Sequence, residues 1–328
     1  MRRRKFLGLV GSASIASPIS AWGQAAERVR NIGVLLAVPR DDLEGATRIA
    51  AFRRGLEELG WIVDRNIRLH VRFAASSDQA PALAKEIVGL RPEVVMAHTT
   101  GMVEALRNET SDIPIVFINV SDPIGSGFVT HLARPNSNVT GFMLYDASIA
   151  GKWLSMLKEI APHVTRVAFV GNPKTTPFDY YWRMAESLAS ALAIKLVPLR
   201  IESATEIVSA LEAFAQSPNG GFLPLPDPTM SKHREVIIDT AARLRLPAVY
   251  TGRYYVVAGG LLSYETDRNE LSRQAATYVD RILRGEKPVN LPVQVPVNYK
   301  TTLNLRTAKA LGLTVPPGLL VSADDVIE

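Results

Sequence analysis

The sequence of 328 residues contains no cysteine, and this absence excludes several kinds of chemistry. Without cysteine the chain forms no disulfide, carries no thiol nucleophile and cannot be lipidated on an N-terminal cysteine. Histidine is scarce too: five histidines, at positions 70, 98, 131, 163 and 233, lie far apart and form no H-x-x-x-H pair. The sequence therefore predicts no metal site built from neighbouring residues.

Motifs of common enzyme classes are also missing. The chain has no G-x-S-x-G elbow, no G-x-x-x-x-G-K-[ST] phosphate loop and no G-x-G-x-x-G after its first predicted strand. We therefore expect no catalytic residues and no cofactor. A hydrolase that uses Asp122 and His98 is the disfavoured enzymatic alternative.

Excess charge is scarce once the first residues are set aside. The net charge is +5, and Arg2, Arg3, Arg4 and Lys5 supply four of these charges, which leaves +1 for the rest of the chain. A basic face that could follow a phosphate backbone is therefore not expected, and neither is a nucleic-acid partner.

The first 26 residues have the pattern of an export signal. A basic start is followed by a moderately apolar stretch and then by small residues, and residues 3–7 (RRKFL) fit the twin-arginine motif. We expect residues 1–26 to be a signal peptide of this type, cleaved near residues 23–26, with an ordinary Sec signal as the alternative. Serines and Pro18 interrupt the apolar run, so a membrane-spanning helix of about 20 residues is not expected. The predicted location is the periplasm.

The remaining sequence alternates apolar runs with segments of helical periodicity. Residues 31–38 form a continuous apolar run, as expected of a strand covered on both faces. Residues 44–61 then place Ile49, Phe52 and Leu56 on one helix face. Because this alternation continues to the C-terminus, we predict an α/β protein with parallel sheets, and its length suits two lobes.

Residues 113–146 mark the passage between these lobes. A buried strand over 113–120 ends in Ser121, Asp122 and Pro123, and a second extended run over 139–145 precedes the next round of strands and helices. A site between two such lobes is the expected place for function.

Three predicted strands end in an Asp-Pro or Asn-Pro pair, at Asp122, Asn172 and Asp227. Ligands of open α/β sheets bind outside the carboxyl ends of the strands, so these side chains are candidates for ligand contacts. Each pair is also typical of a helix N-cap followed by proline, which is the alternative for each residue. Together the three loops predict one shared cleft.

Two further groups of residues complete the candidate site. Thr99, Thr100 and Gly101 follow the third strand and can present hydroxyls and helix amides to a carboxylate, although a plain helix cap is the alternative. Aromatic residues also cluster at strand ends, where a few of them would form flat walls for a small organic ligand and the others would be core. They are Tyr145, Phe178, Tyr180, Tyr181, Trp182, Tyr250, Tyr254, Tyr255 and Tyr264.

Several segments carry a family likeness. They are FRRGLEELGW at 52–61, IPIVF at 113–117 with SDP at 121–123, LARP at 132–135 with NVTG at 138–141, LPAVY at 246–250, GGLLSY at 259–264, and the tail over 307–327. With these motifs the chain resembles the ABC sub-bind family of ABC-transporter substrate-binding proteins, which includes tryptophan- and tyrosine-type binding proteins.

The resemblance implies a type I periplasmic-binding-protein fold, in which two doubly wound lobes are joined by three crossovers and close on ligand like a hinge. It implies an N-terminal lobe of residues 27–142 and 266–292 and a C-terminal lobe of residues 143–265 and 293–328. This chain has Thr99-Thr100-Gly101 where relatives often have Gly-Thr-Pro, so contacts carried over to that loop differ.

The resemblance also implies a function. We expect the periplasmic solute-binding component of an ABC importer, a monomer that delivers a small carboxylate-bearing or aromatic, amino-acid-like ligand to the importer's permease. The expected ligand contacts are Thr99, Thr100, Ser121 and Asp122 from the first lobe, and Tyr145, Asn172, Asp227 and Tyr254 from the second lobe and hinge. An exported sensor that reports to a signalling receptor is the alternative.

Overall fold

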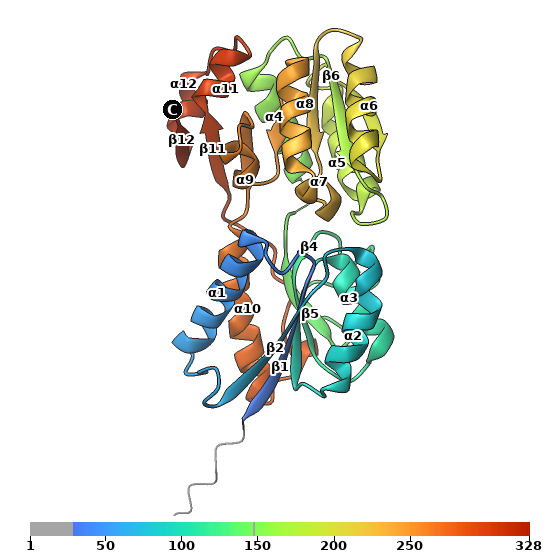
Figure 1. Ribbon diagram of the computed structural model, residues 1–328, viewed down its shortest axis with the longest axis vertical. Helices are drawn as coiled ribbons and strands as arrows, with labels where there is room; N and C mark the ends of the chain where they lie inside the picture. The colour runs from blue at the N-terminus through green and yellow to red at the C-terminus, as the bar shows by residue number, and fades with distance from the viewer. Residues whose placement is uncertain (1–28, 147) are drawn as a thin grey trace, which may run out of the picture.

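Two α/β lobes make up the described part of the chain, residues 29–146 and 148–328 of a computed structural model (Figure 1). The predicted α/β class and two-lobe architecture are confirmed. The predicted leader, residues 1–26, lies outside the described residues, and the lobe boundaries at residues 142, 265 and 292 stay predictions.

The first lobe is built on a five-stranded parallel sheet with the order β2-β1-β3-β4-β5. Its apolar strands are buried because helices cover both faces: α1 and α10 pack together on one face, and α2 and α3 cover the other (Figure 1). The bounds are β1 (Arg30–Leu36), β2 (Ile67–Phe73), β3 (Val94–His98), β4 (Ile115–Val120), β5 (Val139–Met143), α1 (Leu43–Glu58), α2 (Ala80–Gly89), α3 (Thr100–Glu109) and α10 (Arg268–Leu283), with a 3-10 turn at Ser77–Gln79.

The second lobe contains a three-stranded sheet, β7-β6-β8, and a four-stranded sheet, β12-β11-β10-β9. A single bridge between Phe222 and Ala248 joins them. The strands are β6 (Arg166–Gly171), β7 (Lys195–Arg200), β8 (Gly220–Pro224), β9 (Val249–Tyr250), β10 (Leu262–Glu265), β11 (Lys300–Asn304) and β12 (Asp325–Ile327). The helices are α4 (Ile149–Ile160), α5 (Phe178–Ala189), α6 (Ala204–Ala215), α7 (Pro228–Lys232), α8 (Arg234–Leu244), α9 (Arg253–Val257), α11 (Leu305–Ala310) and α12 (Pro317–Val321), with a 3-10 turn at Pro288–Asn290 before β11.

Two local features differ from the parallel βα pattern expected from the sequence. Strand β11 runs antiparallel to β10. The helical segment after β8 is divided into α7 and α8, because His233 between them has φ −103° and ψ 24°, outside the α-helical range. The division places the short helix α7 at the edge of the space between the lobes (Figure 1).

The chain passes between the lobes three times: after β5, after β10, and before β11. Before the last passage, Gln294 lies beside β5, where its N–H donates to Gly141 O and its carbonyl accepts from Met143 N–H, both at 2.9 Å. Buried hydrogen bonds hold the passages together: Thr266 Oγ1 donates to Leu144 O at 3.0 Å, and Tyr145 Oη donates to Thr251 O at 2.8 Å.

Close contact between α1 and α10 depends on a glycine. A Cβ added at Gly55 of α1 would lie 2.6 Å from Arg273 O and 2.9 Å from Ala276 Cβ, both on α10. Such distances force one helix to shift, since real Cβ atoms do not approach backbone oxygens so closely. The two helices carry Arg48 and Arg268 toward the space between the lobes, so their separation also sets the position of these two side chains.

We predict that Gly55→Ala lowers the free energy of unfolding by about 1–3 kcal/mol, because the overpacking outweighs the roughly 1 kcal/mol that alanine gains over glycine in a helix. Gly89→Ala, at the end of α2, is the matched control, because nothing lies within 4 Å of the added methyl group. Urea unfolding followed by circular dichroism measures both variants. Equal stability of the two variants would contradict the predicted close packing.

Candidate functional site

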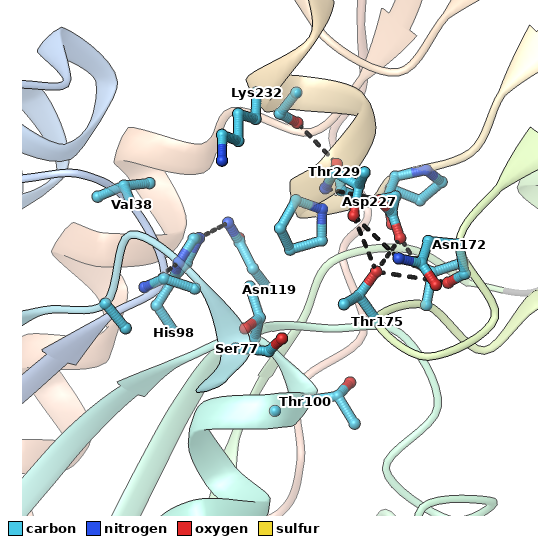
Figure 2. A pocket seen from close by; sticks show the side chains of 18 of the residues that line it. Val38, Ser77, His98, Thr100, Asn119, Asn172, Thr175, Asp227, Thr229 and Lys232 are labelled. Atoms are coloured by element: carbon cyan, nitrogen blue, oxygen red, sulfur yellow. Dashed lines mark hydrogen bonds between the residues drawn. The ribbon is translucent and has the colours of Figure 1, made fainter. Parts of the chain in front are cut away.

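A cavity of about 420 Å³ lies between the lobes. It is open at the carboxyl ends of β1, β3 and β4 in the first lobe and at the loops that follow β6 and β8 in the second (Figure 2). Helix α1 adds Glu44 and Arg48 to the lining, and α10 adds Arg268. This is the position at which open α/β sheets bind ligands.

The structure brings six of the eight predicted site residues to this cavity. They are Thr99, Thr100, Ser121, Asn172, Asp227 and Tyr254. Ser121 is buried near the hinge, where its hydroxyl accepts a hydrogen bond of 2.6 Å from Tyr181 Oη of the other lobe. The six residues come from five separate stretches of sequence, so the predicted shared cleft exists as a physical space.

The other two predicted residues, Asp122 and Tyr145, do not line the cavity. The carboxylate of Asp122 accepts from the N–H of Gly125 at 2.7 Å, which is the local capping role considered as its alternative. Tyr145 is fully buried, stacks edge-on against Trp153 and donates to Thr251 O, so its ring belongs to the hinge.

The Asn-Pro and Asp-Pro pairs of the second lobe also cap the backbone. Asn172 Oδ1 accepts from Lys174 N–H at 2.9 Å, and Asp227 Oδ1 accepts from Thr229 N–H at 2.7 Å at the start of α7. Unlike Asp122, both side chains also border the cavity, where Thr175 Oγ1 donates to Asp227 Oδ2 at 2.5 Å (Figure 2). Burial raises the pKa of Asp227, and these hydrogen bonds oppose the rise.

The loop after β3 has an unusual backbone. Thr99 adopts φ 75° and ψ 161°, a conformation that a β-branched residue rarely takes, and its hydroxyl makes no cap bond to α3. The first-turn amides of α3 are therefore left without a side-chain acceptor, next to the cavity that Thr100 and Gly101 line. Such amides are suited to bind an anionic group.

Two buried residues that the sequence did not single out, Arg48 and Asn119, complete the first-lobe wall together with His98. His98 Nδ1 accepts from Ala37 N–H at 3.3 Å, and the carboxamide of Asn119 lies 2.8 Å from His98 Nε2 (Figure 2). Burial, and then the charges of Arg48 and Arg268, hold the pKa of His98 well below its ordinary value. The ring is therefore neutral at neutral pH.

Most residues that line the cavity have polar side chains, and few of them are aromatic. Among the described residues, Tyr254 is the only one of the predicted aromatic wall residues that lines it. Phe178, Tyr181, Tyr250 and Tyr255 are buried in the cores of the second lobe. The sequence could not separate the two groups because a strand-end tyrosine looks the same whether it faces a core or a cleft.

The described residues contain no cluster of three or more His, Asp or Glu side chains placed to hold a metal ion. Within the same residues, none of the helices combines the length and apolarity needed to cross a membrane.

Comparison with known proteins gives a consistent result. The family described as ABC transporter substrate binding protein matches residues 31–327. The tyrosine-binding protein of Clostridioides difficile strain R20291 is 23% identical over 288 residues, which is 88% of this chain and 82% of that protein.

Solved structures share the fold. A conserved domain protein from Vibrio cholerae O1 biovar El Tor has a TM-score of 0.84 at 29% identity, and an ABC domain from Streptococcus pneumoniae in complex with L-Trp has a TM-score of 0.84 at 22% identity. Each match covers 91% of this chain and 100% of the other chain. The predicted type I periplasmic-binding-protein fold is confirmed.

We predict that His98 makes the protein less stable at acidic pH. The unfolded chain takes up a proton on this ring near pH 6.5, whereas the folded state, with its lowered pKa, does not. The free energy of unfolding therefore falls as the pH drops below about 6.5, with a slope of up to about 1.4 kcal/mol per pH unit.

Urea unfolding between pH 7.5 and pH 5 (about half-unit steps) measures this slope. His98→Gln is expected to flatten it, while His131→Gln, at an exposed histidine, keeps the wild-type slope. An unchanged slope in His98→Gln would mean that His98 is not the responsible group.

Proposed function

The chain belongs to the family of ABC transporter substrate binding proteins, as its motifs predicted, and we propose that it is the exported solute-binding component of an ABC importer. The observation that carries this proposal is the polar cavity between two hinged lobes, lined by strand-end side chains of both. A ligand that touches both lobes favours their closed arrangement through its greater affinity for that state.

We propose that the ligand is a small, polar, carboxylate-bearing molecule. The first turn of α3 supports this class, because no side chain caps it and its residues Thr100 and Gly101 line the cavity. The single tyrosine ring in the lining gives less support to a large aromatic ligand, although relatives are described as binding tyrosine or tryptophan.

The second lobe supplies the opposite contacts in this proposal. Asn172, Asp227 and Tyr254 would bind the ammonium or hydroxyl groups of the ligand. Asp227 is suited to this role because its carboxylate is already held in place by Thr175 and the α7 backbone, so little side-chain entropy is lost on binding.

Export and delivery complete the proposed role. Residues 1–26 would direct the chain to the periplasm, and the closed, monomeric protein would hand its ligand to the importer's permease. The proposal includes no catalytic step, since the family and its structural relatives are substrate-binding proteins.

The first test is a thermal-shift screen of the mature protein against amino acids, hydroxy acids and other small carboxylates, followed by calorimetry. A ligand present at 100 times its Kd adds about 2.7 kcal/mol of stability, which raises the Tm by about 5 °C or more for a chain of this size. If no compound of the library shifts the Tm, the proposed ligand class fails.

The second test compares two capping aspartates that differ in their access to the cavity. Asp227→Ala is expected to lower the affinity for an identified ligand about tenfold or more, because a charged hydrogen-bond partner of the ligand is lost. Asp122→Ala is expected to change this affinity less than about twofold. Both variants lose a backbone cap worth about 1 kcal/mol, and Asp227→Ala also loses the hydrogen bond from Thr175. Equal affinities of the two variants, measured by calorimetry, would remove Asp227 from the site.

A further inference from the structure

Arg48 is buried in the wall of the cavity without a hydrogen bond to any described residue. It is only 6% exposed, and its Nε has no partner. The nearest carboxylate, that of Glu44, lies 3.7 Å from a terminal nitrogen, beyond hydrogen-bond distance, and belongs to a side chain that is more than one-third exposed. A buried guanidinium that has only a long ion pair and no hydrogen bond is costly, which makes its position in a ligand cavity informative.

The second arginine of the cavity, Arg268, shows the contrast. Its guanidinium donates to Glu265 Oε2 at 3.0 Å and to Thr251 O at 2.6 Å, and it lies over the ring of Tyr254. Arg268 is therefore already occupied by the protein, and its charge is balanced by Glu265. The donors of Arg48 are the ones still available to a ligand.

Asn119 adds a second available donor next to Arg48. Because His98 Nδ1 accepts from the Ala37 N–H, the proton of the neutral ring must lie on Nε2, which then donates to the carboxamide of Asn119. The acceptor in that bond has to be the amide oxygen. Figure 2 draws the amide nitrogen toward the ring, but the two ends of a carboxamide are told apart only by their partners.

The other end of this carboxamide is buried, lines the cavity and has no partner among the described residues. With the oxygen bound to His98, this free end is the NH₂ group. Asn119 is held there by a backbone at φ 58°, which asparagine tolerates better than most residues, and β4 is irregular at this point. Two donors without a hydrogen-bond partner, one of them charged, thus lie in the wall of the same cavity, on α1 and β4.

We propose that Arg48 and the amide nitrogen of Asn119 form an anion subsite that holds a carboxylate group of the ligand in the first lobe. The inference rests on the proposed solute-binding function and makes its ligand class specific: the carboxylate is required, and amides, esters and decarboxylated amines of the same shape are rejected. A guanidinium binds a carboxylate through two parallel hydrogen bonds, and the amide supplies a third. Ligand binding supplies hydrogen bonds to a buried charge that otherwise has only the 3.7 Å ion pair with Glu44.

The test needs no knowledge of the natural ligand. The Tm is measured in three solutions of the same ionic strength, which contain about 50 mM sodium acetate, sodium chloride or acetamide. Acetate is the small carboxylate probe. The variants are Arg48→Met and, as the matched control, Arg54→Met, which removes an exposed arginine from the same helix. We expect acetate to raise the Tm of the wild type and of Arg54→Met above the chloride value by about 1 °C or more. Acetamide is expected to have no effect on the Tm. In Arg48→Met, the Tm in acetate is expected to equal the Tm in chloride.

A second readout separates a ligand-binding arginine from a structural one. Without added carboxylate, Arg48→Met is expected to keep or raise the wild-type Tm, because methionine replaces a buried charge that has no hydrogen bond and only a long ion pair with the partly exposed Glu44. Arg268→Met is expected to lower the Tm by several degrees. Asn119→Asp, which keeps the acceptor for His98 but turns the free donor into a carboxylate oxygen, is expected to abolish the acetate effect.

Two results would overturn the inference: an acetate effect that persists in Arg48→Met, or a wild type that responds equally to acetate and chloride. An unchanged acetate effect in Asn119→Asp would remove Asn119 from the subsite. Failure of the proposed function is distinct, since then no metabolite of the screen stabilises the wild type. If only the inference fails, a metabolite of the screen still stabilises the wild type, and it stabilises Arg48→Met to the same extent.

Discussion

The buried guanidinium of Arg268 is the contact on which the arrangement of the two lobes depends. It stands at the first residue of α10, directly after the second passage between the lobes, and it binds the carbonyl of Thr251 and the carboxylate of Glu265. The hydroxyl of Tyr145, in the first passage, donates to the same carbonyl. One charge thus joins two passages and a loop of the second lobe, and removing it would leave Glu265 buried and unpaired.

The same region explains why the cavity is polar. The aromatic side chains near it are largely consumed by the hinge and by the core of the second lobe, where Tyr145, Trp153 and Tyr181 pack against one another. The space between the lobes is left to backbone amides, hydroxyls and charges. Arg48 and Arg268 lie close enough to lower the pKa of His98, yet only Arg268 is hydrogen-bonded to described residues, whereas Arg48 has a longer ion pair with Glu44. That difference is what separates a structural arginine from one available to a ligand.

Sequence reasoning predicted the lobes, their βα alternation and the cleft, because apolar runs and helical periodicity report burial directly. It also placed Thr99, Asn172 and Asp227 at strand ends that do border the cleft. It could not separate Asp122 from Asp227, since an Asp-Pro pair caps a helix or turn equally well in both places. Arg48 gave no signal, because one arginine in an amphipathic helix looks like part of its solvated face.

Local patterns in the chain therefore determine which segments become strands and helices, which residues end them, and the family to which the chain belongs. Tertiary structure alone decides which strand-end side chains face the cavity, which tyrosines belong to the hinge, and which of two arginines is left without a hydrogen bond to the described residues. The physical reason is that burial periodicity and capping act over a few residues. The pairing of a buried charge depends instead on atoms far away along the chain. Arg48 of α1 and Asn119 of β4 line one cavity only after the first lobe has folded.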